Sequence, residues 1–146
     1  RTGGNIDRID RTAGRLRIVD YKTGEVAMKI DTTDDLFADD RKKELDAWLQ
    51  TMLYCEAWLM NNPDEAVRPT IYRIKAMSQP DTGDILKLGA DRKNESLLED
   101  YRDVRESFIS GIRVVIASIF SRKEPFRMTK TVSRCNYCPY RGLCRR

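Results

Sequence analysis

Two aspartates and a lysine lie near the start of the chain, in a stretch whose pattern predicts a β-hairpin. Asp7 is in the run GNIDRID, and Asp20 and Lys22 are in RLRIVDYK. Both runs contain β-branched residues, and RTAG between them is typical of a tight turn. A turn at Ala13 and Gly14 would place Asp7 directly opposite Asp20, where paired side chains share one face. Alternation with period two adds Lys22 to that face.

The predicted group of two acids and one amine has the residue types of a metal-dependent hydrolase. Carboxylates directly opposite each other repel, so a compensating cation is expected beside Asp7 and Asp20. Mg²⁺ or Mn²⁺ binds few carboxylates and keeps positions for water and phosphate oxygens, as phosphodiester cleavage requires. Lys22 would then act on the attacking water or on the charge of the transition state. The alternative is that Lys22 only bridges two exposed acids on a solvated strand face.

The complete pattern, G-x-I-D followed by the run IVDYKTG, resembles the PD-(D/E)XK nuclease superfamily. It is similar in particular to the RecB-like nuclease domains of bacterial recombination and repair enzymes, including the AddB type. The resemblance implies that Asp7, Asp20 and Lys22 form the metal and catalytic centre. It also implies that Tyr21 binds the metal through its backbone carbonyl.

Residues 40–60 are predicted to form a helix with one apolar face. That face comprises Leu45, Trp48, Leu49, Met52, Cys55 and Leu59. Gln50 and Tyr54 lie four residues apart on nearly the opposite side, which by periodicity alone indicates an ordinary exposed flank. RecB-like domains carry a Q-x-x-x-Y motif on the helix after D-x-K. The resemblance therefore implies that Gln50 and Tyr54 support the active site or contact the DNA backbone.

The rest of the chain predicts a second hairpin and a long helix. Residues 25–40 lack periodicity and predict an irregular connection. Residues 70–77 alternate like a strand, with ILKLG as the predicted antiparallel partner after a turn at QPDTGD. Apolar residues at helical spacing predict a helix over 96–120, with a capping box formed by Ser96 and Glu99. These elements predict an α/β fold with a mixed sheet flanked by helices, and the resemblance implies the restriction-endonuclease-like form.

Three cysteines near the end of the chain are spaced as C-x2-C-x5-C, at Cys135, Cys138 and Cys144. Thiolates this close together in a reduced protein predict a soft-metal site, either zinc or an iron–sulfur cluster, in residues 134–146. An incidental cysteine-rich tail is the alternative. The AddB-type resemblance implies a [4Fe–4S] cluster whose fourth cysteine lies upstream of the nuclease motifs.

Composition limits the class of protein. The chain has 146 residues, of which 40% are hydrophobic and 34% are charged, and its formal net charge is +4. Its length predicts one domain over residues 1–146, and no apolar run approaches the ~20 residues of a membrane span. We expect a nuclease domain that lacks its N-terminal portion, with a cytoplasmic location and no membrane. The chain contains no histidine, which excludes histidine as base or ligand within it.

The predicted function is that of a Mg²⁺-dependent deoxyribonuclease, an exonuclease of bacterial recombination and double-strand break repair. The resemblance implies DNA as the substrate and a helicase or ATPase as a partner or fused region. Two alternatives stay open. One is a catalytically inactive nucleic-acid-binding module of the same fold, and the other is a zinc-stapled interaction domain.

Overall fold

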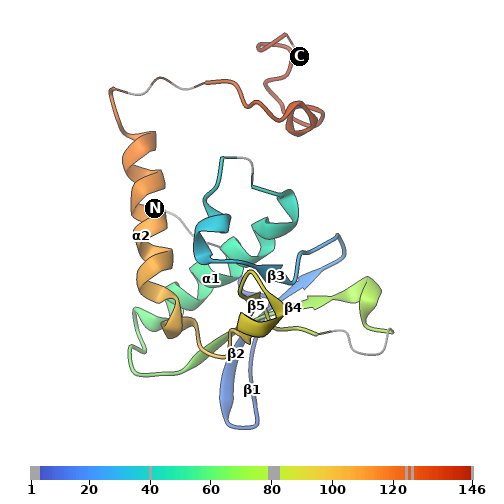
Figure 1. Ribbon diagram of the computed structural model, residues 1–146, viewed down its shortest axis with the longest axis vertical. Helices are drawn as coiled ribbons and strands as arrows, with labels where there is room; N and C mark the ends of the chain where they lie inside the picture. The colour runs from blue at the N-terminus through green and yellow to red at the C-terminus, as the bar shows by residue number, and fades with distance from the viewer. Residues whose placement is uncertain (1–3, 40, 79–82, 124, 126, 146) are drawn as a thin grey trace.

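The computed structural model describes residues 4–39, 41–78, 83–123, 125 and 127–145. Its first sheet contains β1 (Arg8–Thr12), β2 (Arg15–Lys22) and β4 (Val67–Arg73), in the order β1-β2-β4. β1 is antiparallel to β2, whereas β2 and β4 are parallel. β2 is therefore the central strand, and the carboxyl ends of β2 and β4 lie at the same edge of the sheet (Figure 1).

The first hairpin has the predicted turn and register. Ile9 lies opposite Ile18, and the remaining pairs of the ladder follow the same register. Ala13 and Gly14 both have positive φ, at 49° and 79°, which is the backbone of a type I′ turn. This turn matches the right-handed twist of the two strands, so it fixes which side chains share a face.

α1 (Asp46–Leu59) packs against β2 and β4 and covers one face of the first sheet. A short 3₁₀ turn, Lys43–Leu45, precedes it, so the helix proper starts later than the predicted range. The predicted apolar face is confirmed, because its side chains are buried apart from that of Leu49, which is partly buried. The sheet contributes Leu16, Ile18, Val67 and Ile71 to the same core.

A second small sheet contains β3 (Lys29–Ile30), β5 (Lys87–Leu88) and β6 (Ser96–Leu97). β5 is parallel to β3 and antiparallel to β6. The connection predicted to be irregular thus contains a strand, followed by the 3₁₀ turn Thr33–Leu36. Both pieces are held in place because Ile30 and Leu36 are buried in the core.

The predicted second hairpin is wrong. β4 pairs in parallel with β2, and the segment ILKLG contributes β5 to the other sheet. β4 ends at Arg73, where a 3₁₀ turn, Ile74–Ala76, interrupts the alternation. Residues 79–82, which were predicted to form part of the turn, lie outside the described residues. Thr70 and Ile71 are completely buried, so β4 belongs inside the molecule and not in an exposed hairpin.

The predicted long helix starts later than expected. α2 is Arg105–Ile119, and Ser96 lies in β6, so the predicted capping box does not form. A 3₁₀ turn, Tyr101–Asp103, comes before α2, and the side chain of Asp100 caps it. The structure uses the start of the periodic segment to pair with β5, because this pairing buries Leu98.

Beyond α2, the chain runs over one end of the molecule, away from the two sheets (Figure 1). Arg134 donates a hydrogen bond to the carbonyl of Arg41, which ties this segment to the loop before α1. The segment contains a short 3₁₀ turn, Val132–Cys135. Among the described residues, neither helix has the length and apolar character that crossing a membrane requires.

Candidate active site

Asp20 is a buried carboxylate near the carboxyl end of β2. Its residue exposure is 2%, and it lies on the face of the sheet that α1 covers. Lys22 Nζ is 2.8 Å from Asp20 Oδ2. Among the described residues, this ammonium is the partner that the structure gives Oδ2, which accepts no further hydrogen bond there. A buried carboxylate is costly unless cations or donors satisfy it.

The pKa of Asp20 is raised above the ordinary value of an aspartate. Burial is the largest cause, because it disfavours the charged form. The Lys22 ammonium opposes this effect, and the negative charge of Asp7 adds to it. The ionised carboxylate is therefore held in an unfavourable environment, which a bound cation would relieve.

Asp7 is exposed and lies just before β1. Its Oδ2 accepts a hydrogen bond of 2.9 Å from the backbone N–H of Tyr21. The ladder ends at the pair of Arg8 and Val19. Asp7 and Asp20 are next in the same register but do not form a ladder pair, which differs from the prediction. The hydrogen bond nevertheless fixes the Asp7 carboxylate beside the residue that follows Asp20.

A chain of side chains joins Lys22 to α1. Lys22 Nζ donates to Gln50 Oε1 at 2.9 Å, and Gln50 Nε2 donates to the Tyr54 hydroxyl at 2.7 Å. Gln50 and Tyr54 are half-buried, and Gln50 contacts Lys22 at the end of β2, so the interpretation of these two residues as an exposed flank is wrong. They hold the amine of Lys22 in one position.

Gly4 makes room for Tyr54, which sequence reasoning missed. A Cβ atom at Gly4 would lie 2.8 Å from Tyr54 Cε1 and 2.9 Å from its hydroxyl oxygen. Real Cβ atoms do not approach this closely, so any other residue at Gly4 would displace the ring. The glycine three residues before Asp7, which opens the G-x-I-D pattern, was the available signal.

The opposite face of the hairpin holds a stack of arginines and tyrosines. Arg8 donates a hydrogen bond of 2.7 Å to the Tyr21 hydroxyl, and its guanidinium lies over the Tyr72 ring at 5.3 Å. Arg17 pairs with Asp10 through two hydrogen bonds of 2.7 and 2.8 Å. The stack fixes Tyr21, whose backbone lies between the two aspartates of the candidate site.

The cysteines do not form a metal site in the described part of the chain. Cys135, Cys138 and Cys144 are free thiols there, and no group of three or more ligating side chains among the described residues could hold a metal. Cys55 is fully buried in the core, and burial raises the pKa of its thiol strongly, which makes it a poor ligand.

A comparison with known protein families identifies the family of this chain. The sequence profile of the PD-(D/E)XK nuclease superfamily matches residues 2–145. The chain belongs to the PD-(D/E)XK nuclease superfamily. Its mixed α/β architecture agrees with the restriction-endonuclease-like fold, as predicted. No curated protein and no solved structure matches the chain.

Membership of the PD-(D/E)XK superfamily indicates a nuclease-type function with DNA as the substrate. Nucleases of this superfamily typically use divalent metals. The candidate site offers oxygen ligands of the hard type that such cations prefer, in Asp7 and Asp20. The buried Asp20 carboxylate fits this requirement, because its raised pKa shows that the Lys22 ammonium does not fully offset the cost of burying its charge.

Proposed function

We propose that this chain is a RecB-like nuclease domain that hydrolyses phosphodiester bonds of DNA at Asp7, Asp20 and Lys22. The observation that carries the proposal is the buried Asp20 carboxylate, whose Oδ2 lies 2.8 Å from the positioned amine of Lys22. Burial raises the pKa of this acid despite the Lys22 ammonium beside it, which is unusual for an acid that only stabilises the fold. The intact set of Asp7, Asp20 and Lys22 argues against an inactive binding module.

Asp7, Asp20 and the backbone carbonyl of Tyr21 would hold a Mg²⁺ or Mn²⁺ ion. When bound, the ion supplies a lower pKa for a coordinated water and neutralises charge on phosphate oxygens. Asp20 must be ionised to take part, and its raised pKa means that burial opposes ionisation until a cation is present. Asp7 is the more accessible of the two acids, because it is exposed while Asp20 is buried.

Lys22 has the right number of donors for a catalytic role. An ammonium carries three N–H groups. Asp20 Oδ2 and Gln50 Oε1 occupy two directions around Nζ, at 2.8 and 2.9 Å. The third direction is available to the attacking water or to a phosphate oxygen. Gln50 is itself held by Tyr54, so this direction is fixed before the substrate binds.

Single-turnover cleavage of a labelled oligonucleotide by Lys22→Ala tests the proposal. We expect cleavage to fall by a factor of ~10² or more, because a charge that acts in the transition state is lost. Affinity for DNA and for Mn²⁺ should remain near that of the wild type. Lys87→Ala is the matched control, since Lys87 pairs with Glu95 in the second sheet. Undiminished cleavage by Lys22→Ala would refute the assignment.

The metal ligands are tested separately by calorimetric titration with Mn²⁺. Asp20→Asn should abolish Mn²⁺ binding, because a neutral amide cannot replace the buried carboxylate as an anionic ligand. Equal Mn²⁺ affinity of the wild type and Asp20→Asn would show that the ion binds elsewhere.

We also propose that this nuclease acts as an exonuclease in bacterial recombination and double-strand break repair, beside a helicase or ATPase partner or a fused region. The support is the presence of D-Y-K together with the Q-x-x-x-Y pair, in which Gln50 contacts Lys22 and Tyr54 holds Gln50. An AddB-type [4Fe–4S] cluster, or Zn²⁺, at Cys135, Cys138 and Cys144 remains a prediction for the protein that carries this domain. The described residues contain no group of three or more side chains that could hold a metal, and the reaction proposed at Asp7, Asp20 and Lys22 does not use these thiols.

A further inference from the structure

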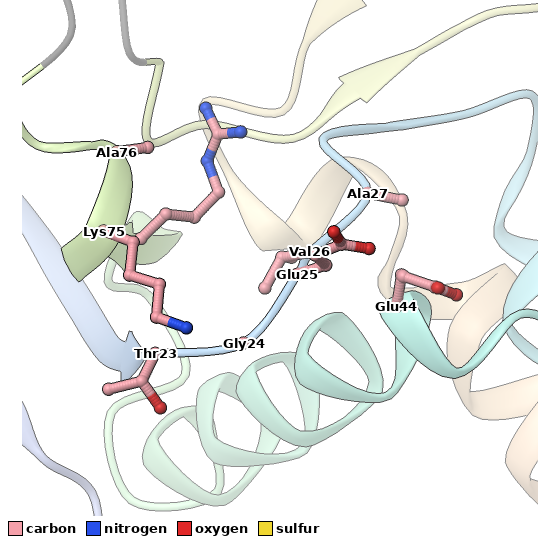
Figure 2. Close-up of a pocket in the computed structure, with 9 residues that line it drawn as sticks. Thr23, Gly24, Glu25, Val26, Ala27, Glu44, Lys75 and Ala76 are labelled. Atoms are coloured by element: carbon pink, nitrogen blue, oxygen red, sulfur yellow. The ribbon is translucent and has the colours of Figure 1, made fainter.

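A hollow lies at the carboxyl ends of the parallel strands β2 and β4, where ligands commonly bind in open α/β sheets. Its volume is about 500 Å³, and its walls come from the loop after β2, the 3₁₀ turn before α1, the end of β4 and the turn after β4. Figure 2 shows Thr23 and Gly24 along its floor, with the amine of Lys75 beside Thr23. The hollow therefore begins directly after Lys22.

Charges of opposite sign line this hollow. Arg73 and Lys75 come from the end of β4 and the turn after it, and Glu25 and Glu44 come from the loop after β2 and the turn before α1. Within the described part of the chain, none of these four side chains is in an ion pair. The two cations are thus available to an anion from solution, and the two acids restrict that anion to the wall formed by β4.

A second hollow, of about 380 Å³, adjoins the first and is lined by Lys22. The two hollows share Gly24, Glu25, Val26 and Glu44. A Cβ atom built at Gly24 meets no described atom within 4 Å, and its backbone is not strained. The fold therefore does not require glycine at this position. Because Gly24 has no side chain, nothing projects from it between the hollow that Lys22 lines and the hollow that Arg73 and Lys75 line.

The register of the sheet sets the distance between these groups. Lys22 and Arg73 are paired residues of adjacent parallel strands, whose axes lie about 4.8 Å apart. Both therefore leave the same edge of the sheet side by side, and Lys75 follows in the turn after β4. A strand whose scissile phosphate lies at the candidate site would therefore pass Arg73 and Lys75 as it continues along this edge of the sheet.

We infer that Arg73 and Lys75 bind the backbone phosphates of the DNA strand beside the scissile phosphate, and that this strand crosses Gly24. The inference rests on the proposed nuclease function and adds positioning residues to it. Contacts of this type go to the phosphate backbone, so they hold the substrate without selecting a base sequence. Glu25 has the opposite effect, because it lies on the same path and repels the phosphates.

The test is the salt dependence of binding of a fluorescent single-stranded oligonucleotide to the 146-residue chain without divalent metal, measured by anisotropy. Lys75→Ala is expected to reduce the slope of log K against log[salt] by ~0.7, because one phosphate contact is lost. Arg73→Ala should act likewise, although Arg73 also contacts the carbonyl of Gly83. Glu25→Gln should strengthen binding at low salt. Arg113→Ala, on α2, removes the same charge elsewhere and should leave the slope unchanged.

The outcomes separate the inference from the proposed function. If the wild-type chain binds DNA and Lys75→Ala has the same slope as Arg113→Ala, the inference is wrong while the nuclease proposal stands. If the wild-type chain binds no DNA at low salt in this metal-free assay, the inference is wrong, and the nuclease proposal is judged separately by the cleavage assay with metal. Lys75 is exposed, so loss of its side chain should not unfold the domain, and thermal unfolding of each variant checks this point.

Discussion

Asp10 and Asp20 lie on opposite faces of one hairpin, and their pKa values shift in opposite directions. Hydrogen bonds from Arg17 hold the pKa of Asp10 below its ordinary value, and Arg8 adds to this effect. Burial raises the pKa of Asp20. The ionised form of Asp10 thus stabilises the fold, whereas the ionised form of Asp20 destabilises it.

Substitution of each acid by asparagine should therefore change stability in opposite directions. Asp10→Asn should lower the free energy of unfolding at about pH 7 by about 2 kcal/mol, because the buried Arg17 loses the acid that it contacts most closely and keeps only the more distant Asp84 among the described acids. The ionised Asp10 stabilises the protein above its unfolded pKa of 3.8, and this contribution is lost as the pH falls through its lower folded pKa.

Asp20→Asn should raise the free energy of unfolding of the metal-free chain at about pH 7, since the buried charge is removed. The gain should disappear below the unfolded pKa of 3.8, where wild-type Asp20 is protonated in both states. Urea unfolding at about pH 7 and about pH 3 measures both variants. A lower free energy of unfolding for Asp20→Asn at neutral pH would contradict the view that burying the ionised Asp20 destabilises the metal-free fold.

Sequence reasoning could predict that Asp7, Asp20 and Lys22 come close together, because they lie in one local hairpin. It could not predict the contact of Gly4 with Tyr54. That contact joins the start of the chain to the middle of α1, and it depends on the packing of the helix on the sheet. The hydrogen bonds that join Lys22, Gln50 and Tyr54 could be expected only from the family resemblance, because helical periodicity alone places Gln50 and Tyr54 on an exposed flank.

At the scale of elements, the β1–β2 turn carries a residue that disfavours its own conformation. Ala13 has φ of 49°, in the left-handed region, and type I′ turns prefer glycine or asparagine there. Ala13→Gly should therefore raise the free energy of unfolding by about 0.5–1 kcal/mol in spite of the greater entropy of the unfolded chain. Thermal unfolding measures this gain, and Ala13→Val is the matched control, which should destabilise the turn. A lower stability of Ala13→Gly would mean that Ala13 makes a compensating contact.

The elements that sequence reasoning placed wrongly share a physical cause. β4 and β5 were expected to pair because they are close in sequence, but β4 pairs with β2 across a long connection. Ser96 was expected to cap a helix, but it belongs to β6. In both places the pairing of one strand with another overrides a local pattern, and periodicity cannot detect such pairing. The apolar face of α1 was predicted correctly because one strong periodic segment determines it.

At the scale of the whole molecule, the three C-terminal cysteines contribute little to the fold described here. Cys135 is buried but lies outside the main core, and Cys138 and Cys144 are partly exposed. The combined change of all three to serine should shift the melting temperature of the metal-free chain by no more than ~2 °C. In a chain loaded with iron or zinc, the same change should remove the bound metal, as measured by elemental analysis. A large loss of stability without metal would show that these thiols pack into the domain.

The parallel pairing of β2 with β4 also determines the order in which the domain assembles. The β1–β2 hairpin closes a tight turn and can form within microseconds, whereas β4 must wait for the chain through α1 to fold back. Asp20 and Lys22 are therefore aligned early, but Arg73 reaches its place beside Lys22 only when the non-local pairing is complete. Pulse-labelling hydrogen exchange during refolding should protect the amides of the hairpin before those of β4. A newly made chain would thus align the acids of its candidate site before Arg73 is in place to bind the phosphates of a DNA strand.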